Sequence, residues 1–241
     1  MAILACGHHL GTQDISDCIS CGQLCFACYI KHKCRKDMQI SMYTIVRDEE
    51  NCIAELLATV EPYVREMIVL DTGSTDRTIE VCREFPKARV YTTQFNDDFG
   101  AAKTIAMHLC KEKWSLNLDA DERIDSKDLD KLAAFMKEAF RRTNEWEVFT
   151  FPRKRWADIE RRNQGETEAY PDRQPRLHLN NRNYRWERKL DEQLVGPVHY
   201  LNQDEIVIHH FQDVFRSDER KKRRPVARFA EDGGAPIICV C

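Results

Sequence analysis

Strand-like and helix-like segments alternate from Gln39 to Phe140, and this alternation restricts the possible folds more than any other feature of the 241-residue chain. Short apolar runs are typical of buried strands, and apolar residues three and four positions apart are typical of helices that cover a sheet. Because the connections are short, the pattern predicts an α/β fold with a mostly parallel sheet flanked by helices. We expect strands at 40–46, 67–70, 88–92 and 114–118, and helices at 49–60, 75–82, 99–110 and 126–140.

After Glu147 the pattern becomes rich in strands, which we expect at 148–152, 176–179 and 206–211. The segment from Arg153 to Arg173 is polar and charged, as expected of a loop or lid. We therefore predict that residues 38–225 form one domain. The tail at 226–241 contains Pro and Gly, and we expect it to be mobile.

Two acidic clusters stand where short apolar runs stop. Asp71 follows Val69-Leu70, and the triplet Asp119-Ala120-Asp121 follows Leu118. In an open α/β sheet such positions lie at the carboxyl edge, where ligands bind. A carboxylate pair spaced Asp-x-Asp is suited to a hard divalent cation, and the cation in turn can hold a diphosphate. The two clusters therefore predict a site for a sugar nucleotide.

Composition excludes several classes of protein. Charged residues make up 32% of the chain and hydrophobic residues 42%, and no run approaches the ~20 apolar residues that span a bilayer. The formal net charge of −3 gives no overall attraction to nucleic acid or to anionic lipid. The start of the chain lacks the basic lead of a signal peptide, so we expect a cytoplasmic protein without a transmembrane segment.

Residues 1–37 are predicted to be a small zinc-binding module. Six of the eleven cysteines lie between Cys6 and Cys34, and most of the candidate ligands are spaced so that a tight turn aims both at one ion. One or two tetrahedral zinc ions fit this set, and two ions would suit a cross-brace similar to B-box and RING modules. Redox-active or simply buried cysteines are the alternative. The pairs are Cys6 with His9 (or His8), Cys18 with Cys21, Cys25 with Cys28, and His32 with Cys34.

Five motifs follow one another along the chain. They lie at 44–50, 70–78, 97–103 and 114–122, and in the C-terminal strings 174–177, 184–186, 191–192 and 208–211. In this order they resemble those of family 2 glycosyltransferases with a GT-A fold, closest to the branch that includes lipopolysaccharide core β-glucosyltransferases. The resemblance extends from about Ser41 to about Lys222. The family usually has Asn at Asp48, tends to have Arg at Lys103, and often has His-Glu at Asp191-Glu192.

The resemblance implies how a donor would be held. Asp121 would coordinate Mn²⁺ or Mg²⁺ directly, and Asp119 would reach the metal through water or hold the ribose. His210 would complete the metal or diphosphate site, in preference to His209, which points the other way in a strand. The remaining expected donor contacts are the nucleobase with Asp71, the loop backbone at Gly73, the backbone at Val46, and the diphosphate with Lys103, although an ordinary surface lysine is equally compatible with Lys103.

Glu192 is the expected general base for the acceptor hydroxyl, with Asp191 as the second candidate. The resemblance implies inversion at the anomeric carbon. The acceptor stays open among saccharides, lipid-linked saccharides, proteins and nucleic acids. Two alternatives also remain: a nucleotidyltransferase, although the segment Arg47-Asp48-Glu49-Glu50 lacks the glycines of its first loop, and a non-catalytic zinc-module interaction protein with a degenerate GT-A scaffold.

Overall fold

The computed structural model describes residues 38–139, 147–161, 170–211 and 214–215. The predicted zinc module at 1–37 and the tail at 226–241 lie outside the described residues. The boundaries proposed for these two parts therefore remain predictions.

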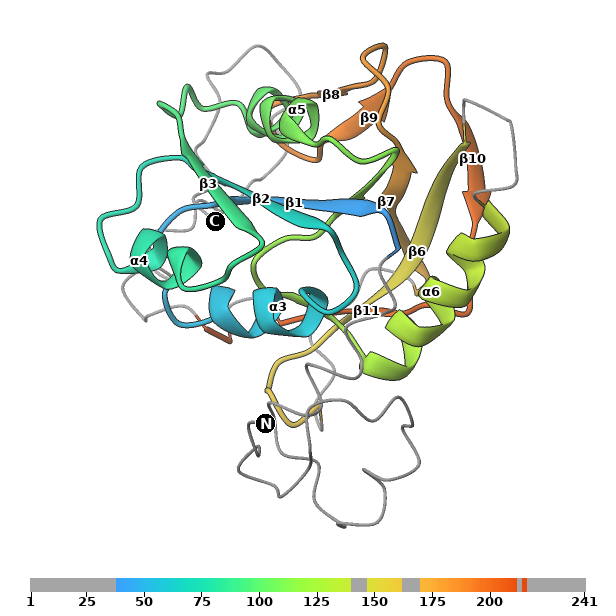
Figure 1. The fold of residues 1–241 in the computed structure, drawn as a ribbon, viewed down its shortest axis with the longest axis horizontal. Helices are drawn as coiled ribbons and strands as arrows, with labels where there is room; N and C mark the ends of the chain where they lie inside the picture. The colour runs from blue at the N-terminus through green and yellow to red at the C-terminus, as the bar shows by residue number, and fades with distance from the viewer. Residues whose placement is uncertain (1–37, 140–146, 162–169, 212–213, 216–241) are drawn as a thin grey trace, which may run out of the picture.

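A nine-stranded sheet forms the centre of the described part of the chain (Figure 1). Its strand order is β3-β2-β1-β4-β7-β6-β11-β5, and β10 pairs with β6 beside β11. The strands β8 and β9 form a separate two-stranded hairpin. The bounds are β1 Ile40–Val46, β2 Glu66–Asp71, β3 Ala88–Thr92, β4 Trp114–Asn117, β5 Glu122–Ile124, β6 Glu147–Arg155, β7 Asp172–Leu179, β8 Arg185–Glu187, β9 Gln193–Val195, β10 His199–Asn202 and β11 Ile208–His210.

The α/β prediction is confirmed, but the sheet is mixed rather than purely parallel. Strands β3, β2, β1 and β4 are parallel neighbours, as expected. Strand β7 then pairs antiparallel with both β4 and β6, and β5 pairs antiparallel with β11. All three antiparallel pairs of this sheet involve strands that follow β4 in the chain, and the described residues between β6 and β7 include no crossover helix, which an antiparallel pair does not need.

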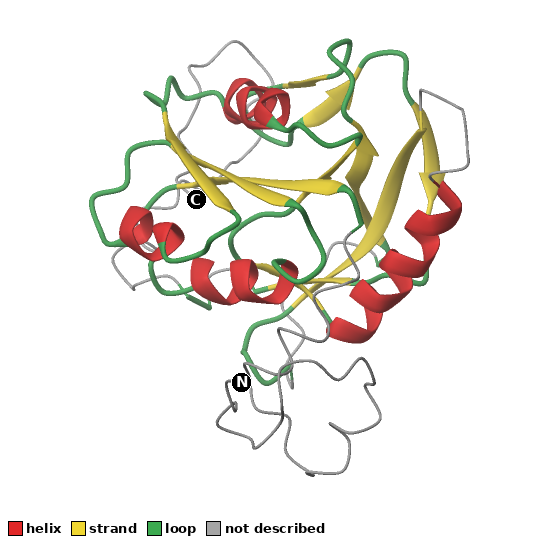
Figure 2. Cartoon of the chain, viewed as in Figure 1, coloured by secondary structure: helices red, strands yellow, loops and turns green. Residues whose placement is uncertain are grey.

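Helices cover both faces of the parallel half, which explains its apolar strands. Figures 1 and 2 show α5 on one face and α3 and α4 on the other, with α6 beside β6 and β10. Every residue of β1 and of β2 is buried, as expected of strands covered on both faces. None of the helices among the described residues is long and apolar enough to cross a bilayer. The helices are α3 Ile53–Val60, α4 Thr78–Arg83, α5 Phe99–Leu109 and α6 Ser126–Ala139.

Two helices begin later than predicted because the residues before them form turns. Helix α3 starts at Ile53, and α4 starts at Thr78. The Asp76 carboxylate accepts hydrogen bonds from the Thr78 amide (2.9 Å) and from the Glu50 amide (3.2 Å), so it joins the two turns. Helix α5 matches its prediction closely, and the Asp98 side chain caps it by accepting from the Ala101 amide (2.8 Å).

A buried hydrogen-bond chain links β1, β7 and β8. The indole of Trp186 donates to the Tyr43 hydroxyl (2.8 Å), which lies 2.9 Å from Nε2 of His178. The other ring nitrogen, Nδ1, lies 2.9 Å from the Leu179 carbonyl oxygen and donates to it, so Nε2 accepts from Tyr43. This pattern uses a neutral imidazole, and burial is the main reason that the pKa of His178 is lowered to about 4.

His178 should therefore make the protein less stable in acid. The pKa of His178 in the folded protein lies below its ordinary value. The contribution of His178 to the free energy of unfolding is therefore fully present above about pH 6.5 and is lost as the pH falls toward 4, a loss of up to about 3 kcal/mol. Urea unfolding at pH 7 and pH 4.5 should show a smaller pH effect in His178→Gln than in wild type. His199→Gln, which changes an exposed histidine, is the control. Equal pH effects in wild type and His178→Gln would contradict the assignment.

Candidate functional site

The carboxyl ends of β1, β2 and β4 meet at one edge of the sheet. Val46 is paired with Asp71 in the β1–β2 register, and Tyr43 is paired with Asn117 in the β1–β4 register. The Thr72 amide continues the ladder by donating to the Val46 carbonyl (2.9 Å). The acidic clusters that follow β2 and β4 are therefore brought to the same edge, as their positions in the sequence predict.

The loops that follow β1 and β2 are tied together by side-chain hydrogen bonds. Asp48 has a left-handed backbone (φ 53°), which Asp and Asn adopt more readily than most residues. Its amide donates to the Ser74 hydroxyl (2.8 Å), and its carboxylate accepts from the Thr75 amide (2.6 Å). Glu50, in the same loop as Asp48, likewise accepts from the Arg77 amide (3.1 Å). The two loops consequently form one surface beside the sheet edge.

Asp71 shapes the loop that follows it. Its buried carboxylate accepts from the amides of Gly73 (3.0 Å) and Ser74 (3.1 Å). Gly73 has a φ of 109°, a conformation that glycine adopts without strain. Neither Asp71, Gly73 nor Val46 lines the pocket described next, so their predicted contacts with a nucleobase and donor stay predictions.

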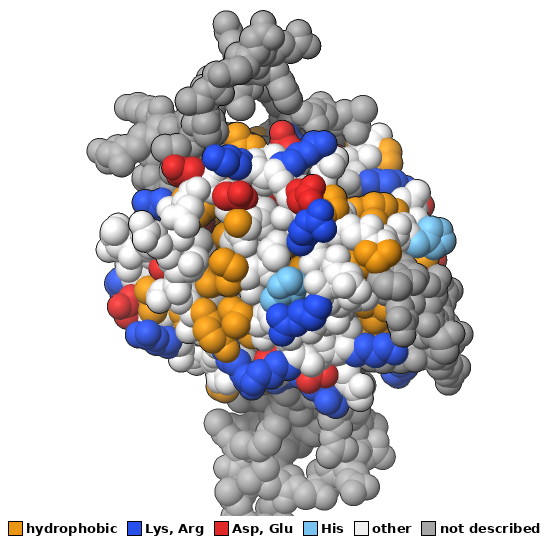
Figure 3. All heavy atoms as spheres, turned by 90° about the horizontal axis from the view of Figure 1, so that it is seen from above, with side chains coloured by type: hydrophobic (Ala, Val, Ile, Leu, Met, Phe, Trp, Pro, Cys, Tyr) orange, Lys and Arg blue, Asp and Glu red, His pale blue; other side chains and the backbone are white. Residues whose placement is uncertain are grey.

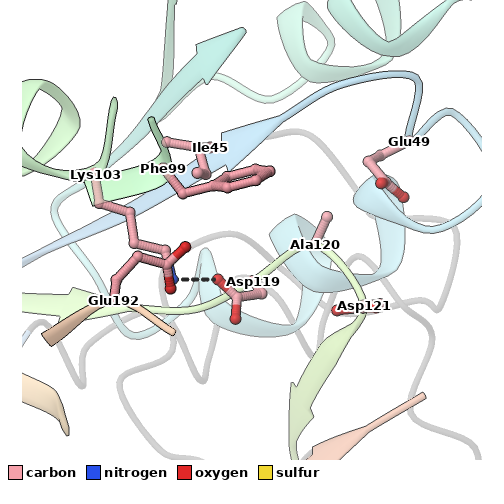
Figure 4. A pocket seen from close by; sticks show the side chains of 8 residues that line it. All are labelled: Ile45, Glu49, Phe99, Lys103, Asp119, Ala120, Asp121 and Glu192. Carbon is pink, nitrogen blue, oxygen red and sulfur yellow. Dashed lines mark hydrogen bonds and ion pairs between the residues drawn. The ribbon is translucent and has the colours of Figure 1, made fainter. Parts of the chain in front are cut away.

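A cavity of about 120 Å³ opens beside the ends of β1 and β4 (Figure 4). It brings together four of the predicted site residues, namely Lys103, Asp119, Asp121 and Glu192. Asp191, the second candidate base, is exposed and does not line the cavity. The lining residues, which we call the pocket, are Ile45, Glu49, Phe99, Lys103, Asp119, Ala120, Asp121 and Glu192.

Lys103 lies between two carboxylates at the base of the pocket. Its ammonium is 3.3 Å from Asp119 and 3.3 Å from Glu192, and only 7% of its side chain is exposed. Burial alone would lower the pKa of Lys103, but the two carboxylates outweigh it and the pKa is raised. The ammonium also lies 5.3 Å from the centre of the Trp186 ring. Lys103 is thus a charged pocket residue and not an ordinary surface lysine.

Asp119 is held as an anion by two cations. Besides Lys103, the guanidinium of Arg176 lies 3.1 Å from its carboxylate. Burial by itself would raise the pKa of Asp119, but Lys103 and Arg176 lower it to well below the ordinary value. Its amide donates to the Glu122 carboxylate (3.1 Å), so the triplet is also fixed by a short turn. Both cations therefore favour the ionised form of the Asp119 carboxylate.

A buried ion-pair series extends from the pocket into the sheet. Arg176 is 2% exposed and donates to Asn117 (2.9 Å), to Asp119 and to the fully buried Glu122. Burial would lower the pKa of Arg176, but Glu122 and Asp119 raise it further. Charges alternate along the series Glu192, Lys103, Asp119, Arg176, Glu122 and Arg153.

Asp121 faces a histidine from the last strand. Its carboxylate lies 3.3 Å from Nε2 of His210, and its carbonyl accepts from the Phe211 amide (2.9 Å). The side chain of His209 lies instead beside Trp156 and Asp125. It accepts a hydrogen bond from the Trp156 indole (2.9 Å), and its Nε2 lies 3.4 Å from the Asp125 carboxylate. Of the two neighbouring histidines, His210 lies beside the acidic triplet, and its part in a metal or diphosphate site stays a prediction.

Asp121 and His210 fit a divalent cation as a partial set of ligands. A carboxylate oxygen and an imidazole nitrogen are donors that Mn²⁺ accepts, and Mg²⁺ sites often use one or two carboxylates plus substrate phosphates. The buried Nδ1 atom of His210 has no hydrogen-bond partner. No group of three or more His, Cys, Asp or Glu side chains converges within the described residues, so the other ligands would have to be phosphate oxygens or water.

Sequence patterns alone did not identify Arg176 as part of the site. It lies within one of the motifs, but no local pattern indicates a role for it, because its partners Glu122 and Asp119 are 54 and 57 residues away in the sequence. The available signal was an arginine in a segment that was expected to form a strand. The pocket residues Ile45, Glu49 and Phe99 were also missed, because nothing local distinguishes them from core or loop residues.

Comparison with models of known families identifies a family that matches the chain. The family described as glycosyl transferase family 2 matches residues 41–191, more than half of the chain. A TPR repeat-containing protein of Synechococcus elongatus is 44% identical over 86 residues, covering 36% of this chain and 21% of that protein. An uncharacterized glycosyltransferase of Rickettsia felis is 36% identical over 91 residues, covering 38% of this chain and 31% of that protein.

The matched region spans about a fifth to a third of the length of these curated relatives. Among solved structures, TarS of S. aureus is similar with a TM-score of 0.43 and 18% identity, covering 58% of this chain and 47% of that chain. Similarity at this level carries no argument about a ligand.

Removal of the Arg176 guanidinium should destabilise the fold strongly. Arg176→Met leaves the buried carboxylate of Glu122 without its main partner, which should cost about 3–5 kcal/mol of unfolding free energy. The double variant Arg176→Met/Glu122→Gln should recover part of this loss, because no buried charge then lacks a partner. Urea unfolding followed by circular dichroism measures both. Arg185→Met, at an exposed arginine, is the control. An unchanged stability of Arg176→Met would contradict the assignment.

Proposed function

The chain belongs to glycosyl transferase family 2, and we propose that it is a metal-dependent glycosyltransferase that moves a sugar from a nucleoside diphosphate sugar to an acceptor hydroxyl. One observation carries the proposal. Lys103, Asp119, Asp121 and Glu192 line one cavity at the carboxyl edge of parallel strands. That edge is where open α/β sheets bind their ligands.

The donor's diphosphate is proposed to lie in the pocket between Lys103 and Asp121, with His210 next to Asp121 just outside the lining. Asp121 and His210 would hold a Mn²⁺ or Mg²⁺ ion, as their 3.3 Å approach supports. The ion would supply Lewis-acid stabilisation of the departing diphosphate. The Lys103 ammonium would donate to a phosphate oxygen, and Asp119 would hold the ribose or a metal-bound water. The buried cations around Asp119 keep it ionised for that task.

The nucleoside is proposed to bind along the joined loops after β1 and β2. The carboxylate of Asp71 has lone pairs beyond those used by the two loop amides, and these would accept from the nucleobase. The backbone at Val46 and Gly73 would flank the base. The position of these loops at the same sheet edge as the pocket supports this placement.

Glu192 is proposed as the general base that takes the proton from the acceptor hydroxyl. Its inclusion in the pocket lining supports it over Asp191, which is exposed. A base on the side of the sugar opposite the diphosphate would give inversion at the anomeric carbon. The acceptor class is left open among saccharides, lipid-linked saccharides, proteins and nucleic acids, as is membership of the lipopolysaccharide core branch.

The cysteine-rich segment is proposed to bind one or two structural zinc ions and to serve recognition or docking. Its paired ligands would close tetrahedral sites and leave no open position for chemistry. The residues that carry the proposed transfer reaction all lie beyond Gln39.

Asp121→Asn should abolish most donor turnover without unfolding the protein. If Asp121 is a direct metal ligand, release of nucleoside diphosphate should fall by about two orders of magnitude or more. The assay incubates UDP-glucose, UDP-N-acetylglucosamine or GDP-mannose with Mn²⁺ and no acceptor, and thermal shift reports binding. Asp204→Asn, with a side chain that is 68% exposed, is the control. If the wild type still turns over the donor in EDTA, the proposed metal dependence is wrong. If none of the donors binds or is turned over, a non-catalytic scaffold is favoured.

Elemental analysis of protein purified without added metal should find one or two zinc ions per chain. Cys18→Ser or Cys25→Ser should lower the count, since such small segments fold by binding the metal. Cys82→Ala, at a buried free cysteine of the α/β domain, should leave it unchanged. A zinc-free protein with the six N-terminal cysteines in disulfides would overturn both the module and the cytoplasmic placement.

A further inference from the structure

The hairpin formed by β8 and β9 carries Glu192 into the pocket. Its turn covers residues 188–192, and Glu192 directly precedes β9. The outer side of the hairpin faces solvent, with Arg185, Glu187 and Arg188 exposed. The face of the molecule drawn in Figure 3 carries basic, acidic and apolar side chains together, with no extended patch of acidic residues. The position of Glu192 must therefore be fixed from the inner side of the hairpin.

The first turn of α5 binds the hairpin turn through its backbone. Amides at the start of a helix have no partner within the helix. Here the Phe99 amide donates to the Lys189 carbonyl (3.3 Å), and the Gly100 amide donates to the Arg188 carbonyl (3.2 Å). These two bonds place the turn directly against the helix that also carries Lys103.

Gly100 is where the two backbones approach most closely. A Cβ atom at this position would lie 2.7 Å from the Arg188 carbonyl oxygen and 3.0 Å from the Trp186 carbonyl oxygen. Both neighbours are backbone atoms, so neither can rotate away as a flexible side chain would. Any side chain at position 100 must therefore move the turn away from the helix or shift the helix itself.

Strand β8 is firmly attached at Trp186, two residues before the turn, so such a movement would concentrate in the turn. The Thr104 hydroxyl accepts from the Trp186 amide (2.8 Å) and lies 3.2 Å from the Trp186 carbonyl oxygen, to which it donates. The Trp186 indole is bonded to Tyr43 in β1. By contrast, Arg188 and Asp191 in the turn already adopt left-handed backbones (φ 75° and 51°).

We propose that Gly100 is a positioning residue, whose missing side chain allows the 188–192 turn to rest on α5 and thereby sets Glu192 beside Lys103 and Asp119. The proposal rests on the proposed function for the role of Glu192. Gly100 touches no substrate, and it acts on the proton transfer only through the place of the Glu192 carboxylate. A displacement of about 1 Å at a catalytic group can cost on the order of a hundredfold in rate.

Amide hydrogen exchange tests the contact without any donor. In Gly100→Ala the amides of residues 186–193 should exchange roughly tenfold faster or more, as expected when a local unit opens more easily. Ala101→Ser is the matched control, because it adds one heavy atom at the neighbouring exposed position of the same helix. Since alanine favours a helix over glycine, loss of helix propensity cannot explain the effect. Unchanged exchange in Gly100→Ala would overturn the proposal.

Donor hydrolysis with Mn²⁺ and the three sugar nucleotides tests the consequence, with water in place of the acceptor hydroxyl. Gly100→Ala should lower kcat by roughly ten- to a hundredfold and leave the donor KM within about twofold. In a Glu192→Gln background the same substitution should have less than about a twofold further effect, because both changes act on one group.

Hydrogen exchange and donor hydrolysis test different parts of the proposal. Independent, multiplicative effects of Gly100→Ala and Glu192→Gln would mean a merely structural role and overturn the proposal. If the wild type releases no nucleoside diphosphate from any donor, the proposed function fails and the catalytic consequence fails with it. The exchange measurement then still decides whether Gly100 sets the turn.

Discussion

The rest of the described structure depends on the buried hydrogen bonds and ion pairs that the guanidinium of Arg176 makes. It lies where the parallel half of the sheet meets the antiparallel half, and it reaches the end of β4 at Asn117, the triplet at Asp119 and the start of β5 at Glu122. A buried guanidinium loses its hydration and is tolerated only when several acceptors replace water. Here those acceptors, Asn117, Asp119 and Glu122, also form the edge of the sheet. The same contacts therefore compensate the buried charge and shape the site.

Because of Arg176 the two aspartates of the triplet have different surroundings. Asp119 is surrounded by cations of the protein itself, whereas Asp121 has a histidine beside it. An anion with two fixed cationic partners is rigid, but it attracts a further cation weakly. Asp121 instead lies 3.3 Å from Nε2 of His210, an imidazole that can be neutral and that can share a metal ion with it. The two carboxylates of the Asp-x-Asp triplet thus line the same pocket with different partners, two cations for Asp119 and a histidine for Asp121.

Much of the first half of the fold could be predicted from the sequence, because apolar periodicity is a local signal. Strand β1 and helix α5 were placed almost to the residue, and parallel pairing explains why the acidic clusters share an edge. Strand β5 was missed, since Glu122 and Arg123 make it look like a surface turn although both are buried. The short strands β8–β10 were missed for a similar reason, as they are too short for a period to appear. The contact of Gly100 with Arg188 depends on the fold and has no local signal.

The order of strands has a consequence for synthesis of the chain. The four parallel strands are complete once residue 117 has been made, yet β5, which follows at once, pairs with β11 at 208–210. At ~5–20 residues per second, translation leaves β5 without that partner for on the order of ten seconds. For the first part of this interval, until residue 176 has been made, Glu122 also lacks its ion-pair partner Arg176. The pocket likewise needs Glu192, so its charged lining is assembled only after the segments of β7 and of the β8–β9 hairpin have been made, well after the four parallel strands.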